Sequence, residues 1–415
     1  MNVDTSAIPA VAARERIEPA KLERLVRGGI AVLMGRDDAT RIAIGKELRT
    51  KINVNLGTSP LSCEEAEELE KAAIAKRYGG DTVSDCSTAG YIDALRKKLI
   101  ARAGMPVTTI PVYQAVASAG SFEATSDEII LATIKKHVKD GAASIVIHAG
   151  FTLETLRLLK KSGRIMGVVS KGGSMTAAIS LSQGRENPFV TLFDEILGLL
   201  EGTGVVLNLG NAMRSGCVHD LKDEPQLQEI YANSRLAERA NERGVQAIIE
   251  GLGGHVNARV LKDWIEEHNR ITGNRPLFVA GPLPTEIGVG HDHISAAIGG
   301  AMAAGYGADY LCAITPAEHL GLPSAAHVRE GVVAARIAAH VGDSMKFGIG
   351  TCFDEDKLLS ESRSRKDWQA QFEHAIDPET ARSIHPDEGK ECSMCGKFCS
   401  IAIMRKYGLD SAFDV

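Results

Sequence analysis

Three cysteines stand close together near the C-terminus, in the segment Cys392-Ser-Met-Cys395-Gly-Lys-Phe-Cys399. Three thiolates at this spacing can hold three irons of a 4Fe–4S cluster, and the fourth iron is then left without a protein ligand. Such an open iron can bind the amine and carboxylate of S-adenosylmethionine, which a reduced cluster cleaves to a 5′-deoxyadenosyl radical. The spacing therefore indicates radical chemistry, which also needs an external electron donor.

A structural zinc site is the alternative interpretation of the same cysteines. Structural zinc has four closed ligands, so a fourth would have to come from His385 or Cys352 upstream. Ferredoxin-type electron carriers use four cysteines for each cluster, which favours an open site here. A non-catalytic zinc or electron-carrier protein stays open as an alternative of another class.

Composition narrows the functional class. The chain has 415 residues, of which 44% are hydrophobic, and a formal net charge of -6. This length suits a (β/α) barrel with added termini, and the charge argues against nucleic-acid binding, although a phosphorylated metabolite needs only a local cationic pocket. No apolar run reaches the roughly 18 residues of a membrane span, and Met1 to Glu18 lacks the apolar core of a secretory signal. The eight cysteines do not suggest a disulfide scaffold, so we expect a reducing cytoplasm.

The elements that must position this chemistry alternate between apolar β-rich runs and helical segments, which predicts parallel strands covered on both faces. Polar residues stand at or just beyond the ends of these runs, and a (β/α)8 TIM-type barrel would gather them at one mouth. Nine strands are one too many, so one must lie outside the ring. The predicted strands are Lys51–Gly57, Asp81–Ser87, Val107–Tyr113, Ser144–Gly150, Met166–Lys171, Gly204–Gly210, Gln246–Gly251, Pro276–Gly281 and Ala308–Thr315. The polar residues are Asn55, Asp85, Tyr113, His148, Ser170, Asn211, Glu250 and Thr315.

Four regions follow from this pattern: a helical N-terminal region (1–50), the barrel as substrate domain (51–323), a helical extension (324–386) and a cluster-binding tail (387–415). Ser62 with Glu65, and Thr125 with Glu128, predict capping boxes at the starts of two barrel helices. Gly141 is expected to end the second of these helices. Further helices are expected at Ser324–Val341 and Arg365–Ile376.

The cysteine segment, preceded by Asp377-Pro-Glu-Thr-Ala-Arg382-Ser, resembles the C-terminus of the phosphomethylpyrimidine synthase family. These are radical enzymes of the thiamin pathway that act on aminoimidazole ribotide. The resemblance runs from about Lys51 to Ile403. Its further matching stretches are Asn53-Val-Asn55-Leu-Gly57, Ile147-His148-Ala-Gly150, Gly172-Gly173-Ser174, Gly281-Pro-Leu283 and Glu318-His319-Leu-Gly-Leu-Pro323.

The resemblance implies a site built from positions spread along the barrel. It implies a second divalent metal (zinc, iron or cobalt) held by His255 and His319, and a homodimer whose cluster tail caps a barrel. Among the substrate contacts, Glu250, Tyr113 and His148 would be catalytic. The implied substrate contacts are Asn55, Ser84, Tyr113, His148, Ser170, Lys171, Gly172, Asn211, Arg214, Glu250 and Phe278.

Several of these positions depart from the residues usual in the family. Ser84 stands in place of Met, Lys171 of Arg, Asn211 of Asp and Phe278 of Tyr, and one residue is added before His255. The departures fall on substrate positions while the cluster and metal ligands remain. They therefore favour a related reaction of the same substrate, namely formation of 5-hydroxybenzimidazole for the lower ligand of a cobamide, with phosphomethylpyrimidine synthesis as the alternative.

The residue types suit a phosphorylated imidazole nucleotide. Two glycines after Lys171 let backbone N–H groups approach a phosphate, although the segment also suits a plain βα turn. Arg214 can bind phosphate through two hydrogen bonds or form a surface ion pair. Glu250 can accept a proton or bind an amino group, or form an ion pair at the barrel rim. Tyr113 and His148 can hydrogen-bond the ribose or imidazole, or only fill the mouth.

Overall fold

The computed structural model describes residues 5–348, 354–385 and 391–409. Cys352, considered above as a zinc ligand, lies outside these residues. The chain divides into two compact units, Met1–Lys346 and Phe347–Val415, and each is described by itself below.

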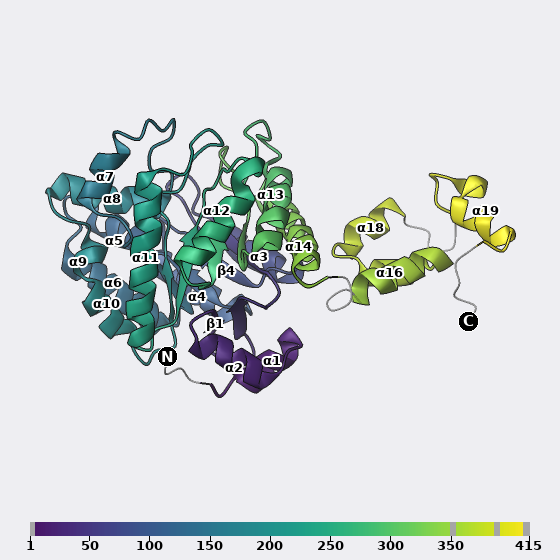
Figure 1. Ribbon diagram of the computed structural model, residues 1–415, viewed down its shortest axis with the longest axis horizontal. Helices are drawn as coiled ribbons and strands as arrows, with labels where there is room; N and C mark the ends of the chain where they lie inside the picture. The colour runs from purple at the N-terminus through teal and green to yellow at the C-terminus, as the bar shows by residue number, and fades with distance from the viewer. Residues whose placement is uncertain (1–4, 349–353, 386–390, 410–415) are drawn as a thin grey trace. The chain divides into compact units, whose positions relative to one another are not determined.

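The first unit is a closed barrel of eight parallel strands in the order β10-β3-β4-β5-β6-β7-β8-β9. Each of the eight strands falls within a predicted one, so the α/β barrel is confirmed, although the strand predicted at Val107–Tyr113 ends at Thr109 because a helix begins at Pro111. The ring (Figure 1) consists of β3 (Lys51–Leu56), β4 (Thr82–Asp85), β5 (Val107–Thr109), β6 (Ser144–Ile147), β7 (Val206–Leu209), β8 (Ala247–Gly251), β9 (Leu277–Val279) and β10 (Tyr310–Ala313).

The predicted strand at Met166–Lys171 is wrong. β6 pairs directly with β7, with Ser144 opposite Val206, so the ring has no place for another strand between them. The backbone N–H groups of Ile165 and Met166 donate to the carboxylate of Asp220 at 2.7 and 3.1 Å instead of to a strand. The segment is a loop that leads into the next helix at Lys171.

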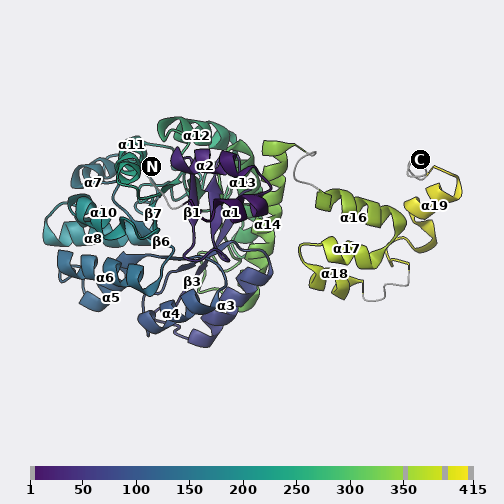
Figure 2. The same ribbon diagram turned by 90° about the horizontal axis from the view of Figure 1, so that it is seen from below.

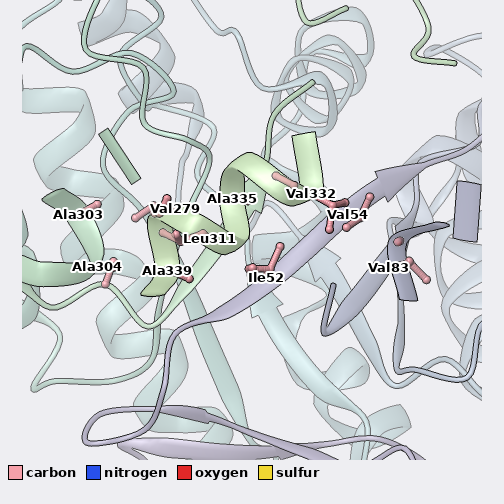
Figure 3. Packing of buried hydrophobic residues seen from close by; sticks show 14 of the residues in the cluster. Ile52, Val54, Val83, Val279, Ala303, Ala304, Leu311, Val332, Ala335 and Ala339 are labelled. Carbon is pink, nitrogen blue, oxygen red and sulfur yellow. The ribbon is translucent and has the colours of Figure 1, made fainter. Parts of the chain in front are cut away.

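Helices surround the strands, as the view along the barrel shows (Figure 2). Their small side chains let them lie close to the strands: Ala335 and Ala339 pack on Ile52, Val54 and their neighbours (Figure 3). Burial of each large apolar side chain in this layer contributes about 1.5–3 kcal/mol. The helices are α3 (Glu65–Arg77), α4 (Ile92–Arg102), α5 (Pro111–Ala119), α6 (Asp127–Asp140), α7 (Leu153–Leu159), α8 (Lys171–Gln183), α9 (Pro188–Thr191), α10 (Phe193–Leu200), α11 (Glu224–Glu242), α12 (Ala258–Ile271), α13 (Asp292–Tyr306) and α14 (Ala325–Phe347).

The N-terminal region is helical, as expected, and it also contains a small antiparallel sheet that the sequence did not signal. Helices α1 (Ile8–Glu15) and α2 (Pro19–Arg27) precede strands β1 (Ala31–Met34) and β2 (Ile42–Gly45). Val32 and Met34 pack with Tyr310 and Phe278 of the barrel. The sheet therefore covers one end of the ring, next to α1 and α2 (Figure 1).

Both predicted capping boxes are wrong, whereas the predicted helix end is confirmed. Ser62 pairs with Ser59 in a turn, because α3 begins only after Glu64, whose side chain forms no cap. Ser126 caps α6 by accepting from Ile129, while the Thr125 hydroxyl donates to the carbonyl of Ser121. Gly141 ends α6 with a φ of 103°.

The second unit consists of short helices. These are α16 (Asp354–Arg365), α17 (Trp368–His374), α18 (Pro378–Ile384), the 3-10 turn η1 (Gly396–Phe398) and α19 (Ser400–Lys406). The helix predicted at Arg365–Ile376 is shorter, because Asp367 caps its start by accepting from the N–H of Ala370. Within the described ranges of the whole chain, we find no helix with the length and apolarity that a membrane crossing requires.

Candidate functional site

A cavity of about 410 Å³ opens where the barrel strands end. Each predicted substrate contact other than Gly172 and Asn211 lines it, so the fold brings together residues that are far apart in the sequence. These are Asn55, Ser84, Tyr113, His148, Ser170, Lys171, Arg214, Glu250 and Phe278.

A second cavity of about 630 Å³ lies at the opposite end, between the N-terminal sheet and the segments before β7 and β8. Arginines on its walls already have acidic partners: Arg41 pairs with Asp38, and Arg243 pairs with Glu201. In barrel enzymes, chemistry takes place at the carboxyl ends of the strands. We therefore assign the site to the smaller cavity, where the unlike polar groups converge.

His148 follows β6 and is held tightly in a neutral state. Its Nε2 lies 2.9 Å from the hydroxyl of Ser170. Burial, together with the charge of Arg214, lowers the pKa of His148 to about 3. Gly172 lies against the ring, because an added Cβ would stand 2.3 Å from its Cε1, and Gly210 would place a Cβ 2.7 Å from its Nε2. Gly172 thus acts behind His148 rather than at the cavity wall.

The loop after β7 places Arg214 at the cavity, and Glu229 of α11 holds this loop through hydrogen bonds to its backbone. The Glu229 carboxylate accepts hydrogen bonds from the N–H groups of Ala212 and Met213 at 2.8 and 2.7 Å. Burial raises the pKa of Glu229 to about 8, against the opposing effect of these two hydrogen bonds and of Arg214. Arg214 also donates to the carbonyl of Asn211 at 3.2 Å.

Glu250, at the end of β8, is the carboxylate of the cavity. Burial raises its pKa, and the charge of Arg214 acts in the opposite direction. The N–H of Asn211 donates to its Oε2 at 3.4 Å, so Asn211 lies behind Glu250 and not on the cavity wall. Across the cavity, the Lys171 ammonium lies 5.3 Å from the ring centre of Tyr113. The cavity therefore has two cations near Tyr113 and His148, and it has a carboxyl group, Glu250, whose raised pKa disfavours ionisation.

His255 and His319 meet at the rim with geometry that suits a metal ion. Their Nε2 atoms are 3.2 Å apart. Behind each ring stands a carboxylate: Glu286 is 3.0 Å from Nδ1 of His255, and Asp292 is 3.5 Å from Nδ1 of His319. Metal-binding histidines commonly carry a carboxylate on the second ring nitrogen. In the part of the chain that the structure describes, no group of three or more such side chains is placed to hold a metal, so the remaining positions would belong to water or substrate.

The three cysteines of the second unit lie around η1 and the start of α19. All three are free thiols, and Cys395 is exposed. The backbone N–H groups of Ala402 and Ile401 lower the pKa of Cys399, which favours the thiolate that a cluster needs. Thiolate donors at this spacing fit three irons of a 4Fe–4S cluster. The ring of His385, the described candidate for a fourth zinc ligand, packs against Trp368 with the ring centroids 4.2 Å apart and the planes tilted by 40°.

Further residues that the sequence did not single out as site residues line the cavity, among them Lys71, Cys86, Cys312 and Glu318. Burial raises the thiol pKa of Cys86 and of Cys312 to about 12, so both cysteines are neutral. Glu318 precedes a predicted metal ligand and could have been found from that position. Lys71 sits within α3, a helix rich in charged residues, where a lysine normally indicates a solvated face.

The barrel, its polar mouth and the open cysteine set define a radical S-adenosylmethionine enzyme of the lyase type. The sequence model of the family described as "Radical SAM ThiC family" matches residues 2–406, so the chain belongs to that family. Membership implies a 4Fe–4S cluster and S-adenosylmethionine as cofactors.

Relatives in this family match along almost the whole chain. The phosphomethylpyrimidine synthase of Methanocaldococcus jannaschii is 39% identical over 97% of this chain and 97% of its own length. That of Pyrococcus furiosus is 42% identical over 97% of this chain and 96% of its own length. Among solved structures, the dihydropteroate synthase of Yersinia pestis aligns with a TM-score of 0.43 and 12% identity, over 77% of this chain and 99% of that one.

Proposed function

We propose that the chain rearranges aminoimidazole ribotide to the phosphorylated pyrimidine after which its relatives are named. The convergence of Lys171, Arg214 and Glu250 in one cavity carries this proposal, because a phosphorylated aminoimidazole needs both cations and a proton acceptor. Relatives with 39% and 42% identity bear the pyrimidine name. This name favours the pyrimidine over 5-hydroxybenzimidazole, the product that the sequence departures suggest.

The phosphate would bind between Lys171, Arg214 and the N-terminus of α8. There the positive end of the helix dipole favours negative charge, while the N–H of Gly173 donates to the hydroxyl of Ser170, which caps the helix. Arg214 can offer two parallel hydrogen bonds, which fix the orientation of a phosphate. This arrangement would leave the imidazole ring toward Glu250, with Asn55 and Tyr113 on the cavity wall.

Glu250, Tyr113 and His148 would handle protons around the ring. Burial raises the pKa of Glu250, which makes its carboxylate a stronger proton acceptor than an exposed one. His148 is neutral, and its hydrogen bond with Ser170 orients the ring. Cys392, Cys395 and Cys399 would hold the cluster, which when bound would supply the electron that cleaves S-adenosylmethionine to the adenosyl radical. His255 and His319 would hold a second divalent metal that acts as a Lewis acid or a template.

5-Hydroxybenzimidazole is the second candidate product, and a specific observation supports it. Ser84, Lys171 and Phe278, which depart from the residues usual in the family, line the cavity, and Asn211 contacts Glu250. Substitutions at the wall of the site change the space and charge around a reacting intermediate.

We also propose that the enzyme works as a homodimer in the cytoplasm with an external electron donor.

A product assay tests the proposal. The chain, reconstituted with iron and sulfide without oxygen, is mixed with aminoimidazole ribotide, S-adenosylmethionine and a reductant, and products are read by mass spectrometry. We expect the phosphorylated pyrimidine and 5′-deoxyadenosine from the wild type, and neither from Cys395→Ser. Formation of 5-hydroxybenzimidazole without the pyrimidine would refute the proposed product and support the second candidate.

A further inference from the structure

Lys71 of α3 is a buried ammonium at the wall of the cavity. The residue is 1% exposed, yet it lines the cavity beside the end of β3. Its Nζ donates to Oε1 of Glu68 at 2.5 Å, and the other Glu68 oxygen accepts from the N–H of Gly57 at 2.6 Å. Glu68 is itself 1% exposed, so a buried ion pair stands directly behind the turn that follows β3.

This ion pair leaves donors of Lys71 unused. An ammonium has three N–H donors and no acceptor. Among the described residues, the Nζ donors of Lys71 have a hydrogen-bond acceptor only in Glu68. Buried polar groups are normally satisfied, and a buried cation is costly unless its donors are used. Because Lys71 lies at the cavity wall, a ligand in the cavity can supply the missing acceptors.

The surroundings of Lys71 suit an anion with several oxygens. Thr58 and Ser59, in the same turn, line the cavity beside Lys71, and so does Asn55 at the end of β3. In the closed ring, β3 stands four strands from β7 in either direction. Lys71 therefore lies across the barrel from Arg214, which follows β7. The cavity has a second cationic position, separate from Lys171 and Arg214.

We propose that Lys71 anchors an oxyanion on the β3 side of the cavity, either a carboxylate or a phosphate. The chemistry of binding is the same for both, and the sources differ. A phosphate would belong to the ribotide, and a carboxylate to the methionine part of the adenosyl donor. The assignment to either source rests on the proposed function, whereas anion binding by Lys71 does not.

A simpler role for Lys71 would be to neutralise Glu68, and paired variants separate the two. Lys71→Met with Glu68→Gln removes both charges, keeps the side-chain lengths similar and leaves an amide oxygen for the N–H of Gly57. Glu68→Gln alone frees the ammonium from its competing carboxylate. Lys76→Met alters an exposed lysine of the same helix and is the matched control. Thermal unfolding verifies that each variant is folded.

Calorimetric titration of each full-length chain with ribose 5-phosphate and, separately, with L-methionine measures anion binding without turnover. We expect the double variant to bind one probe at least tenfold more weakly, with Lys76→Met unchanged and Glu68→Gln equal to or tighter than the wild type. Loss for ribose 5-phosphate assigns a phosphate, and loss for methionine assigns a carboxylate. Wild-type affinity for both probes in the double variant, or no binding of either probe by the wild type, would overturn the proposal. Since neither titration needs turnover, failure of the product assay alone would leave this anion site standing.

Discussion

Nε2 of His255 lies 3.2 Å from Nε2 of His319, although 64 residues separate the two in the sequence. The loops after β8 and β10 bring them together, and Glu286 and Asp292 stand behind the two rings. Two ring nitrogens this close, each backed by a carboxylate, suit a shared cation better than a direct hydrogen bond between two neutral imidazoles.

Replacing either histidine should remove a metal without removing the cluster. We expect His255→Ala and His319→Ala to lower the content of the second divalent metal to less than about a tenth of the wild type, because loss of a ligand or its support costs at least tenfold in affinity. Elemental analysis of the purified chains measures this, with iron and sulfide of the cluster as internal reference. His291→Ala, an exposed histidine nearby, is the control. Full metal content in both variants would contradict the site.

Removal of the cysteine tail should leave the barrel folded. The first unit, Met1–Lys346, has its own apolar core of strands and helices. We therefore expect a chain without residues 387–415 to keep its far-ultraviolet circular dichroism and a cooperative barrel unfolding transition, but to lose the cluster absorbance and all turnover. Cys395→Ser should lose the cluster alone, whereas Cys63→Ser should keep it. A barrel that unfolds on truncation would show that the tail has a structural role.

The sequence was sufficient to predict the strands of the barrel, but it was not sufficient to predict one of the loops. Parallel strands buried on both faces appear as apolar runs, and all eight could be found in this way. The run at Met166–Lys171 has the same composition, but the N–H of Met166 at its start donates to the carboxylate of Asp220, and no local pattern reveals that distant carboxylate. The N-terminal sheet was missed because its strands are short and pair with each other next to helices.

The residues of the candidate site could be predicted where they lie in motifs or at strand ends. They could not be predicted where the packing of a helix brings a residue to the cavity. Residues at strand ends, such as His148 and Glu250, reach the cavity because the barrel gathers strand ends. The pairing of His255 with His319 came from the family resemblance, since their spacing alone predicts nothing. Lys71 reaches the cavity only because of how α3 lies against β3, a tertiary relationship that helical periodicity does not encode.

A methyl group at Gly172 should displace His148. The added Cβ of Gly172→Ala would stand 2.3 Å from Cε1 of the ring, which is too close for any contact, so the buried ring would have to shift toward the cavity that it lines. We expect the variant to lose about 1–3 kcal/mol of unfolding free energy from overpacking and to bind ribose 5-phosphate more weakly. Gly167→Ala is the matched control, because its Cβ meets nothing within 4 Å. Equal stability of the two variants in urea unfolding would argue against a fixed His148.

The last prediction concerns pH and Glu229. Burial holds its pKa at about 8 in the folded chain, compared with an ordinary value of 4.5. Between these values the unfolded chain releases a proton that the folded chain retains. The stabilising contribution is therefore complete below pH 4.5 and is lost as the pH rises through about 8, by up to about tenfold in the unfolding equilibrium constant for each pH unit. Glu229→Gln should remove this loss, although it keeps only one of the two hydrogen bonds to the Arg214 loop.

Ionisation of Glu229 should also change the affinity of the phosphate site. Above pH 8 the ionised Glu229 adds a negative charge near Arg214 and Glu250, the charged groups that act on it. Phosphate monoesters are already doubly ionised there, since their second pKa is about 6. We therefore expect the affinity of the wild type for ribose 5-phosphate to fall several-fold between about pH 7 and 9, and that of Glu229→Gln to stay nearly constant. Glu224→Gln, an exposed residue of the same helix, should follow the wild type. A parallel fall in all three chains would mean that another group titrates and that Glu229 serves only to hold the loop.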